Sequence, residues 1–307
     1  MMRTREELGW VKFVSLCVVV VLAALASAGA GAAASMADNS KITLTVGGKT
    51  DTEAQLLTKI YTLLLRHAGF KVTEKARLGT NNIVHAAITS GQIDLYPEFT
   101  ATGLAHLKIK TTHDADKDYQ LVKEGYEKQF HITWLDKSPL NDTYGICTTQ
   151  AKAQAWKVSK ISQLAPMAAK MTVATPPDGT SDPNVLPGLK PTYGFAFGHV
   201  TVVQVALAFD AVKQGKADVN VCYTTMALIP KNNFVLLEDD KSLFPIYLPA
   251  PIVRDATLAK APDIATALNK VAPKLTTETS QQLQLEVLNG KSVTETATGW
   301  LKNQGLL

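Results

Sequence analysis

Two aromatic residues occupy equivalent positions in two similar segments of the chain. Gly91-Gln92-Ile93-Asp94-Leu95 and Gly215-Lys216-Ala217-Asp218-Val219 each follow an expected helix, and each leads four residues later to an aromatic-Thr pair. The pairs are Phe99-Thr100 and Tyr223-Thr224. Because open α/β sheets bind ligands beyond the carboxyl ends of their strands, this spacing predicts two rings that face one crevice from opposite sides. The same spacing also fits rings that only pack against a neighbouring helix.

Residue types that often carry catalysis do not form a recognisable constellation here. The histidines lack the His-Glu-x-x-His spacing of a zinc site, and no Gly-x-Ser-x-Gly segment supplies a serine nucleophile. A nucleophilic Cys147 or Cys222 would need a neighbouring base, and the adjacent sequence offers none. We therefore expect no enzyme, and no metal or cofactor. The histidines are His67, His85, His106, His113, His131 and His199.

The elements that position these rings alternate between short β-branched runs and helical patterns. Thr50 and Glu53 have the spacing of a capping box at the start of the first helix, and Gly69 and Gly91 follow the ends of the first two helices. Strands joined by helical crossovers pair in parallel, so the first part predicts a parallel sheet. The expected elements are strand 42–46, a helix from Thr52, strand 70–74, helix 82–90 and strand 93–96.

The second part of the chain repeats this plan after a crossing near Pro139 and Asn141-Asp142. A loop rich in Pro, Gly and Asp at 175–191 is long enough to suggest a function. After Pro245, Pro249 and Pro251, helical patterns return to cover the first part. The expected elements are helix 114–130, strands 132–135 and 144–148, helix 161–170, strand 171–174, helix 200–214, and strands 218–223 and 234–237.

The N-terminal segment has the pattern of a secretory signal. Arg3, Arg5 and Lys12 precede an apolar run at 13–26 that is shorter than the roughly 20 residues of a membrane span. We predict a signal peptide at residues 1–37, cleaved after Ala37, and a periplasmic protein; cleavage after Ala28 and a retained N-terminal anchor are the alternatives.

Charge and cysteine content narrow the function classes further. Removing residues 1–37 takes away three basic and two acidic residues, so the net charge falls from +4 to +3. The sequence has no cluster of Lys and Arg of the kind that contacts the phosphate backbone of a nucleic acid. We therefore expect that the protein does not bind nucleic acid. We also expect it to be a monomer. An exported compartment permits Cys147 and Cys222 to pair, but two buried thiols fit the sequence as well.

Four stretches carry a resemblance to a known family. The chain resembles the substrate-binding proteins of osmoprotectant ABC transporters, the betaine, choline and carnitine group, over 41–307 and in the same order. The resemblance implies a small quaternary-ammonium ligand and a permease partner in the inner membrane. The stretches are Val46-Gly47-Gly48-Lys49-Thr50-Asp51-Thr52-Glu53, Asp94-Leu95-Tyr96-Pro97-Glu98-Phe99-Thr100-Ala101-Thr102, Asn141-Asp142-Thr143-Tyr144, and Leu237-Glu238-Asp239-Asp240-Lys241 with Phe244-Pro245-Ile246-Tyr247.

The resemblance also implies a binding site made mainly of rings. The positions of the family's aromatic cage fall on Phe99, Tyr144, Tyr223 and Tyr247. A trimethylammonium group donates no hydrogen bond and is recognised by ring faces, each worth ~0.5–2 kcal/mol when water is excluded. For the other end of the ligand, the family's polar contact falls on Thr102.

Lys49 is a further candidate for the polar end of the ligand. It precedes an expected helix N-terminus, where a negative charge is favoured. A solvated Lys49 fits the sequence as well.

The sequence departs from the family's pattern at several of these positions. Phe99 replaces a usual Tyr, Ala101 a usual Gly, and Asp51 and Ala54 replace Phe and Gln in a turn that commonly reads Lys-Asn-Phe-Thr-Glu-Gln. Phe99 keeps a ring face without a hydroxyl, and Asp51 favours a cationic or hydroxylated ligand. These changes affect selectivity among betaines and choline-like compounds.

The predicted fold is an α/β, two-lobed periplasmic-binding-protein fold of type II with a ligand cleft between the lobes. Lobe 1 is expected at 38–139 plus 246–307 and lobe 2 at 140–245, with the crossings as hinges. A binding protein for an amino acid or polyamine is the alternative function, and a secreted α/β enzyme the less favoured one. Amino-acid binders need an arginine for the carboxylate, and Arg66, Arg77 and Arg254 are not expected at the cleft.

Overall fold

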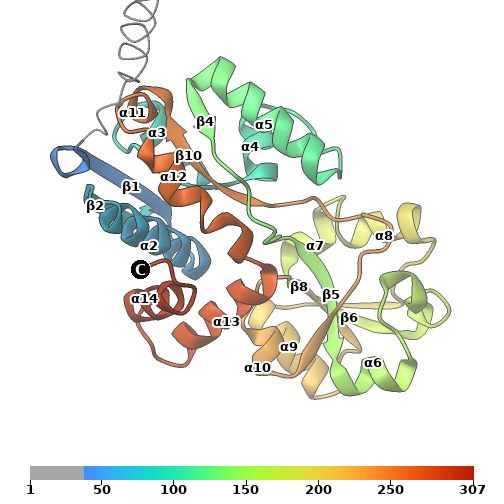
Figure 1. The fold of residues 1–307 in the computed structure, drawn as a ribbon. Helices are drawn as coiled ribbons and strands as arrows, with labels where there is room; N and C mark the ends of the chain where they lie inside the picture. Colours follow the sequence, from blue (N-terminus) through green and yellow to red (C-terminus); the bar gives the residue numbers. More distant parts are fainter. Residues whose placement is uncertain (1–37) are drawn as a thin grey trace, which may run out of the picture. The chain divides into compact units, whose positions relative to one another are not determined.

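The computed structural model describes residues 38–307 (Figure 1). The predicted signal peptide at 1–37, with its cleavage site, lies outside the described residues. Residues 39–307 form one compact unit that contains two five-stranded sheets. Within 38–307, no helix is long and apolar enough to cross a bilayer.

The first sheet has the strand order β2-β1-β3-β10-β4. β1 pairs in parallel with both β2 and β3, which confirms the parallel pairing predicted for the first part of the chain. β10 returns from the far end of the sequence and runs antiparallel between β3 and β4. The strands are β1 (Thr43–Lys49), β2 (Lys71–Gly79), β3 (Leu95–Phe99), β4 (Ile132–Trp134) and β10 (Pro249–Arg254).

β10 was not predicted, because prolines normally exclude a central strand. Here Pro251 lies opposite Pro97 of β3. On its other side the proline carbonyls serve as acceptors: Leu135 N donates to Pro251 O at 2.9 Å, and Ser138 N donates to Pro249 O at 2.8 Å. The prolines are tolerated at positions where they accept hydrogen bonds and need not donate.

The second sheet has the order β7-β6-β8-β5-β9. β6 pairs in parallel with β7 and β8, whereas β5 runs antiparallel to β8 and β9. The chain enters this sheet after β4 and leaves it before β10, so both crossings connect the two sheets. The strands are β5 (Tyr144–Thr149), β6 (Thr172–Thr175), β7 (His199–Val202), β8 (Val219–Tyr223) and β9 (Phe234–Leu237).

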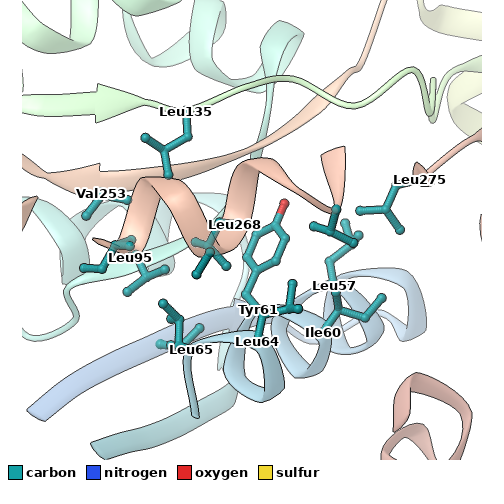
Figure 2. Close-up of a cluster of buried hydrophobic side chains, with 14 of the residues drawn as sticks. Leu57, Ile60, Tyr61, Leu64, Leu65, Leu95, Leu135, Val253, Leu268 and Leu275 are labelled. Atoms are coloured by element: carbon teal, nitrogen blue, oxygen red, sulfur yellow. The ribbon is translucent and has the colours of Figure 1, made fainter. Parts of the chain in front are cut away.

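Helices cover the first sheet and supply most of its core. The apolar stripe of α2 (Thr52–His67) packs with α12 (Asp263–Asn269), α13 (Thr277–Leu288) and α14 (Val293–Asn303), which confirms that the C-terminal helices return to the first part (Figures 1 and 2). A Cβ at Gly48 would lie 2.1 Å from Thr58 Oγ1, so glycine permits α2 to approach the end of β1 this closely. α3 (Asn81–Thr89), α4 (Thr100–His106) and α5 (Ala115–Phe130) complete this half.

The first helix begins at Thr52 as predicted, but the predicted capping box is wrong. Asp51 is the N-cap, and its Oδ1 accepts a hydrogen bond from Ala54 N at 2.8 Å. Glu53 turns inward instead of back to the cap and accepts a hydrogen bond from Ser280 of α13. The aspartate takes the cap because its short carboxylate reaches the free amides of the first turn.

Three predictions for the second half are also wrong. Segment 161–170 forms two short 3-10 turns, η2 (Ile161–Leu164) and η3 (Ala168–Lys170). Segment 200–214 is divided between the exposed edge strand β7 and α9 (Val205–Lys213), because its β-branched start pairs with β6. The predicted loop at 175–191 contains α7 (Pro177–Ser181) and most of α8 (Leu186–Tyr193). α6 (Gln150–Trp156), α10 (Leu228–Lys231) and α11 (Asp255–Leu258) are the remaining short helices.

Cys147 and Cys222 form a disulfide, which resolves the alternative that the sequence left open. They lie on the adjacent antiparallel strands β5 and β8, with their Cα atoms 6.0 Å apart. The bridge therefore ties together the two strands whose ends carry Tyr144 and Tyr223.

We expect the Cys147→Ala/Cys222→Ala variant to be less stable by about 2–4 kcal/mol, because a crosslink over 75 residues restricts the unfolded chain. Urea denaturation of both proteins under non-reducing conditions measures the difference. Identical unfolding midpoints would contradict the prediction.

Candidate functional site

A cavity of about 220 Å³ is lined by residues from both sheets and from both crossings. All six residues predicted for the site line it: Lys49, Phe99, Thr102, Tyr144, Tyr223 and Tyr247. Asp51, Asn81, Asp142 and Thr143 line it too. Asp51 was connected with ligand selectivity on the sequence but not assigned to the site, and the other three were given no role. Their signal was positional, because Asp51 and Asn81 each follow a strand by two residues and Asp142 and Thr143 precede Tyr144.

The four rings reach the cavity from different elements. Phe99 is the last residue of β3, and Tyr223 the last of β8. Tyr144 begins β5 and lies opposite Tyr223 in the ladder, with the two ring centroids 5.1 Å apart. Tyr247 comes from the crossing before β10, and burial raises the pKa of its hydroxyl. The rings therefore form one lining although they are far apart in the sequence.

The two similar segments found in the sequence make the same contacts in both sheets. Gly91 and Gly215 have φ of +80° and +71°, which favours glycine after a helix. Asp94 N donates to Thr45 O, and Thr45 N donates to Asp94 Oδ2 at 2.7 Å. Asp218 makes the same pair of bonds with Thr172 at 2.8 Å. Each aspartate therefore fixes the start of the strand that ends in Phe99 or Tyr223.

The threonine that follows Phe99 holds the crossing that carries Tyr247. Thr100 N donates to Leu248 O, and Thr100 Oγ1 accepts from Leu248 N, both at 3.0 Å. The same hydroxyl donates to Ile246 O at 2.8 Å. Tyr247 is thus held on both flanks by the residue next to Phe99.

The threonine that follows Tyr223 holds the other crossing in the same way. Thr224 N donates to Thr143 O at 2.8 Å, and Thr224 Oγ1 accepts from Thr143 N at 3.0 Å. Its hydroxyl donates to Asn141 O at 2.5 Å. Asp142 is therefore held on both flanks, at the position that corresponds to Tyr247.

The two crossings are also bonded to each other. Asp142 N donates to Tyr247 O at 3.0 Å, and Tyr247 N donates to Asn141 Oδ1 at 2.8 Å. Thr143 Oγ1 donates to Pro245 O at 2.5 Å. This ladder between the crossings sets the spacing of the rings contributed by Tyr144 and Tyr247.

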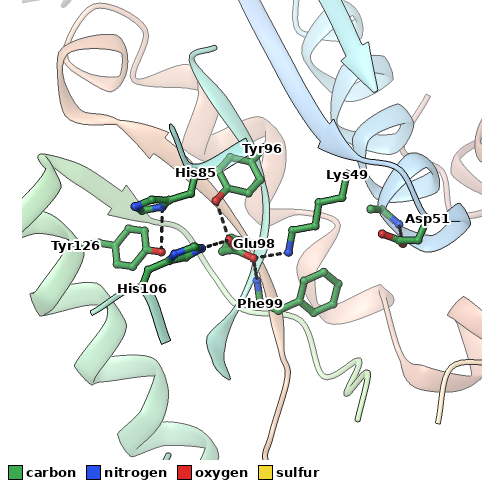
Figure 3. Close-up of polar contacts among 9 residues, drawn as sticks. Lys49, Asp51, His85, Tyr96, Glu98, Phe99, His106 and Tyr126 are labelled. Atoms are coloured by element: carbon green, nitrogen blue, oxygen red, sulfur yellow. Dashed lines mark hydrogen bonds and ion pairs between the residues drawn. The ribbon is translucent and has the colours of Figure 1, made fainter. Parts of the chain in front are cut away.

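Lys49 lines the cavity, but its ammonium is already paired. Lys49 Nζ lies 2.6 Å from Glu98 Oε1 and 5.0 Å from the centroid of the Phe99 ring (Figure 3). Glu98 is fully buried, and its carboxylate also accepts from Tyr96 Oη at 2.7 Å and from Phe99 N at 2.8 Å. The alternative of a solvated Lys49 is wrong, since the residue is 6% exposed.

Two histidines lie behind this ion pair. His85 and His106 stack with their ring centroids 3.9 Å apart, and His106 Nε2 lies 3.9 Å from Glu98 Oε2 (Figure 3). Burial lowers the pKa of His85 to about 4, and the neighbouring His106 contributes to the shift. Burial also lowers the pKa of His106, although Glu98 opposes the change. Both rings are therefore neutral at neutral pH and leave the Lys49–Glu98 pair balanced. Within 38–307, no group of side chains is arranged to hold a metal ion.

A second buried acid lies beside the first crossing. Burial and the nearby Asp142 raise the pKa of Glu53 well above its ordinary value. Burial also raises the pKa of Asp142, whereas its hydrogen bonds to Thr225 and Glu53 oppose the rise. The hydrogen bond between the two carboxyl groups raises the pKa of Glu53 and lowers that of Asp142, so Glu53 is the donor of the pair.

These features define an α/β protein with two sheets and one small cavity between strand ends, the design of a two-lobed solute-binding protein. Residues 42–303 match the family described as the substrate binding domain of ABC-type glycine betaine transport systems. The chain belongs to this family.

Individual relatives cover nearly the whole chain. It is 29% identical to the carnitine transport binding protein OpuCC of Listeria monocytogenes, over 90% of this chain and 91% of the relative. It is 30% identical to the glycine betaine-binding protein YehZ of Escherichia coli, over 85% of this chain and 90% of that protein. A crystal structure of a glycine betaine/carnitine/choline ABC transporter protein superposes with a TM-score of 0.82 at 27% identity, over 86% of this chain and 99% of that one.

Glu53→Gln tests the protonated pair. Glutamine keeps a donor for Asp142 and an acceptor for Ser280 but has no titratable proton. A carboxyl with a raised pKa in the folded protein destabilises the fold progressively as pH rises above its ordinary value. We expect the wild-type free energy of unfolding to fall, relative to that of Glu53→Gln, between about pH 5 and pH 8.

Urea denaturation across this pH range measures the difference, with Glu278→Gln on the exposed first turn of α13 as the matched control. Parallel pH profiles for the wild type and Glu53→Gln would show that Glu53 is ionised in the folded protein.

Proposed function

We propose that this protein captures a small quaternary-ammonium solute in the cavity, with Phe99, Tyr144, Tyr223 and Tyr247 as the aromatic cage. The convergence of four rings from separate elements on one small cavity carries this proposal. Ring faces attract a cation that donates no hydrogen bond, and several of them supply a useful share of the roughly 8 kcal/mol of a micromolar complex.

The comparisons support the same class of ligand. The names of the relatives refer to carnitine and glycine betaine, and a further relative, from Helicobacter pylori, is named for ergothioneine. Among the described residues, no arginine lines the cavity, which disfavours an amino acid as the cargo. Arg66 instead donates to Val72 O at an exposed position.

Capture without chemistry is the mechanism that we propose. Lobe 1, at 38–139 plus 246–307, carries Phe99 and Thr102, and lobe 2, at 140–245, carries Tyr144 and Tyr223. The two bonded crossings act as hinges, and a bound cation stabilises the closed form because rings from both lobes contact it. A permease of the inner membrane would recognise that closed form, with this protein exported to the periplasm as a monomer after removal of 1–37. Neither catalysis nor nucleic-acid binding is part of the proposal.

Replacing Phe99 and Tyr223 by leucine tests the cage, because leucine keeps an apolar side chain but removes the ring face. We expect the double variant to bind glycine betaine and choline at least about tenfold more weakly, since each ring contributes ~0.5–2 kcal/mol. Calorimetric titration with glycine betaine, choline, carnitine and ergothioneine measures the loss, and proline serves as the ligand without a trimethylammonium group.

Tyr223→Phe is the matched control, since it keeps the ring, and Trp156→Ala removes a ring that does not line the cavity. Full affinity in the double leucine variant would contradict the cage. Absence of binding to every trimethylated compound by the wild-type protein would contradict the proposed function.

A further inference from the structure

We propose that the cavity selects a quaternary-ammonium solute that is a net cation with a hydroxyl end, of the choline class, over zwitterions that end in a carboxylate. The inference rests on the proposed function and adds the charge of the ligand's other end. It follows from the charges on the cavity wall and from what neutralises each of them.

Within 38–307, the cavity wall offers no unpaired cation to a ligand carboxylate. Among the described residues, Lys49 is the only basic side chain that lines the cavity. Its ammonium lies 2.6 Å from Glu98, whose side chain is fully buried, so the pair has no net charge. A ligand carboxylate that approached Lys49 would compete with an ion pair held by two further hydrogen bonds, from Tyr96 and from Phe99 N. Breaking such a pair leaves a buried charge uncompensated, which is costly.

Two acidic side chains line the same cavity, and neither forms an ion pair with a basic residue in the part of the chain that the structure describes. Asp51 lies at the N-terminus of α2, and its Oδ1 is bonded to Ala54 N. Asp142 lies in the first crossing, beside the buried carboxyl group of Glu53. Its Oδ1 accepts from Thr225 Oγ1 at 2.8 Å, which is a neutral donor. The wall therefore carries the carboxylate of Asp51 and a second carboxyl group besides the balanced pair.

Helix ends do not reverse this balance. The positive end of α2 is satisfied by Asp51 itself. α3 begins at Asn81 on the wall, and its N-terminus contributes roughly half an elementary charge. That partial charge is smaller than the full charge of the Asp51 carboxylate, so the charged groups of the wall favour a cation over an anion.

Neutral polar groups remain for the other end of the ligand. Asn81 and Thr102 line the cavity and supply an amide and a hydroxyl. A ligand hydroxyl is able both to accept from these groups and to donate to a carboxylate on the wall. A ligand carboxylate only accepts, and it would lie near the Asp51 carboxylate, where like charges repel. The arrangement therefore fits a hydroxyl better than a carboxylate.

The first experiment compares choline with glycine betaine by calorimetric titration of the purified protein, since both contain a trimethylammonium group and differ at the other end. We expect choline to bind about tenfold more tightly or better. Glycine betaine binding as tightly as choline, or more tightly, would overturn the inference and leave the proposed function intact. No binding of either compound would overturn the proposed function together with the inference.

Asp51→Asn then tests the cause of the preference. Asparagine caps a helix about as well as aspartate, so α2 keeps its first turn while the wall loses one negative charge. We expect the choline-to-betaine affinity ratio to fall by about threefold or more, with choline weakened and glycine betaine strengthened. Asp136→Asn, at an exposed position that does not line the cavity, is the matched control and should leave the ratio unchanged.

Glu98→Gln is a second, independent variant. It removes the counter-ion of Lys49 and so adds a positive charge to the wall, and we expect the ratio to move toward glycine betaine. Circular dichroism and the unfolding midpoint establish that the variant is folded before titration. A ratio that stays constant in both Asp51→Asn and the folded Glu98→Gln would overturn the charge-based account.

Discussion

The hydrogen-bonded pairing of the two crossings is the constraint on which the rest of the site depends. Thr100 holds one crossing and Thr224 holds the other, each through the same three hydrogen bonds. Hydrogen bonds of Asn141 and Asp142 with Tyr247 connect the crossings to each other. Thr100 and Thr224 each directly follow a ring that lines the cavity. The segment that Thr100 holds contains Tyr247, and the segment that Thr224 holds directly precedes Tyr144. The backbone ladder that connects the two sheets is therefore also the frame that spaces the four rings.

The aromatic rings that line the cavity lie beside two buried polar pairs, Lys49 with Glu98 and Glu53 with Asp142. Behind Phe99, the Lys49–Glu98 pair is buried and fully bonded, and the neutral His85 and His106 add no charge to it. Beside the first crossing, burial and the neighbouring Asp142 raise the pKa of Glu53. A buried ion pair seldom adds much stability by itself, and this one holds the backbone of Phe99 through Glu98 while the Lys49 ammonium stays paired.

The disulfide and the aspartate anchors act on the same strands. Cys147 and Cys222 join β5 to β8, and Asp218 fixes the start of β8, so the ends that carry Tyr144 and Tyr223 are constrained from two directions. Asp94 does the same for β3 and Phe99 without a disulfide. The chain belongs to the family of substrate binding domains of glycine betaine transport systems, and the rings that line its cavity lie at strand ends and on the crossings between the two sheets.

The sequence by itself determined the alternation of strands and helices, the parallel pairing of β1, β2 and β3, and six of the ten residues that line the cavity. The strands and helices follow from local patterning, and Phe99 and Tyr223 follow from a spacing that repeats between residues 91–100 and 215–224. Tyr144, Tyr247 and Thr102 were implied by the resemblance to a known family. Only the tertiary structure decided three other matters. The strand β10 depends on segments more than a hundred residues away, which pair with it without needing an N–H donor from its prolines. The N-cap at Asp51 depends on Glu53, which accepts a hydrogen bond from Ser280 in the core and therefore does not complete a capping box with Thr50. The pairing of Lys49 with Glu98, and of Cys147 with Cys222, depends on neighbouring strands that no local pattern in the chain brings together.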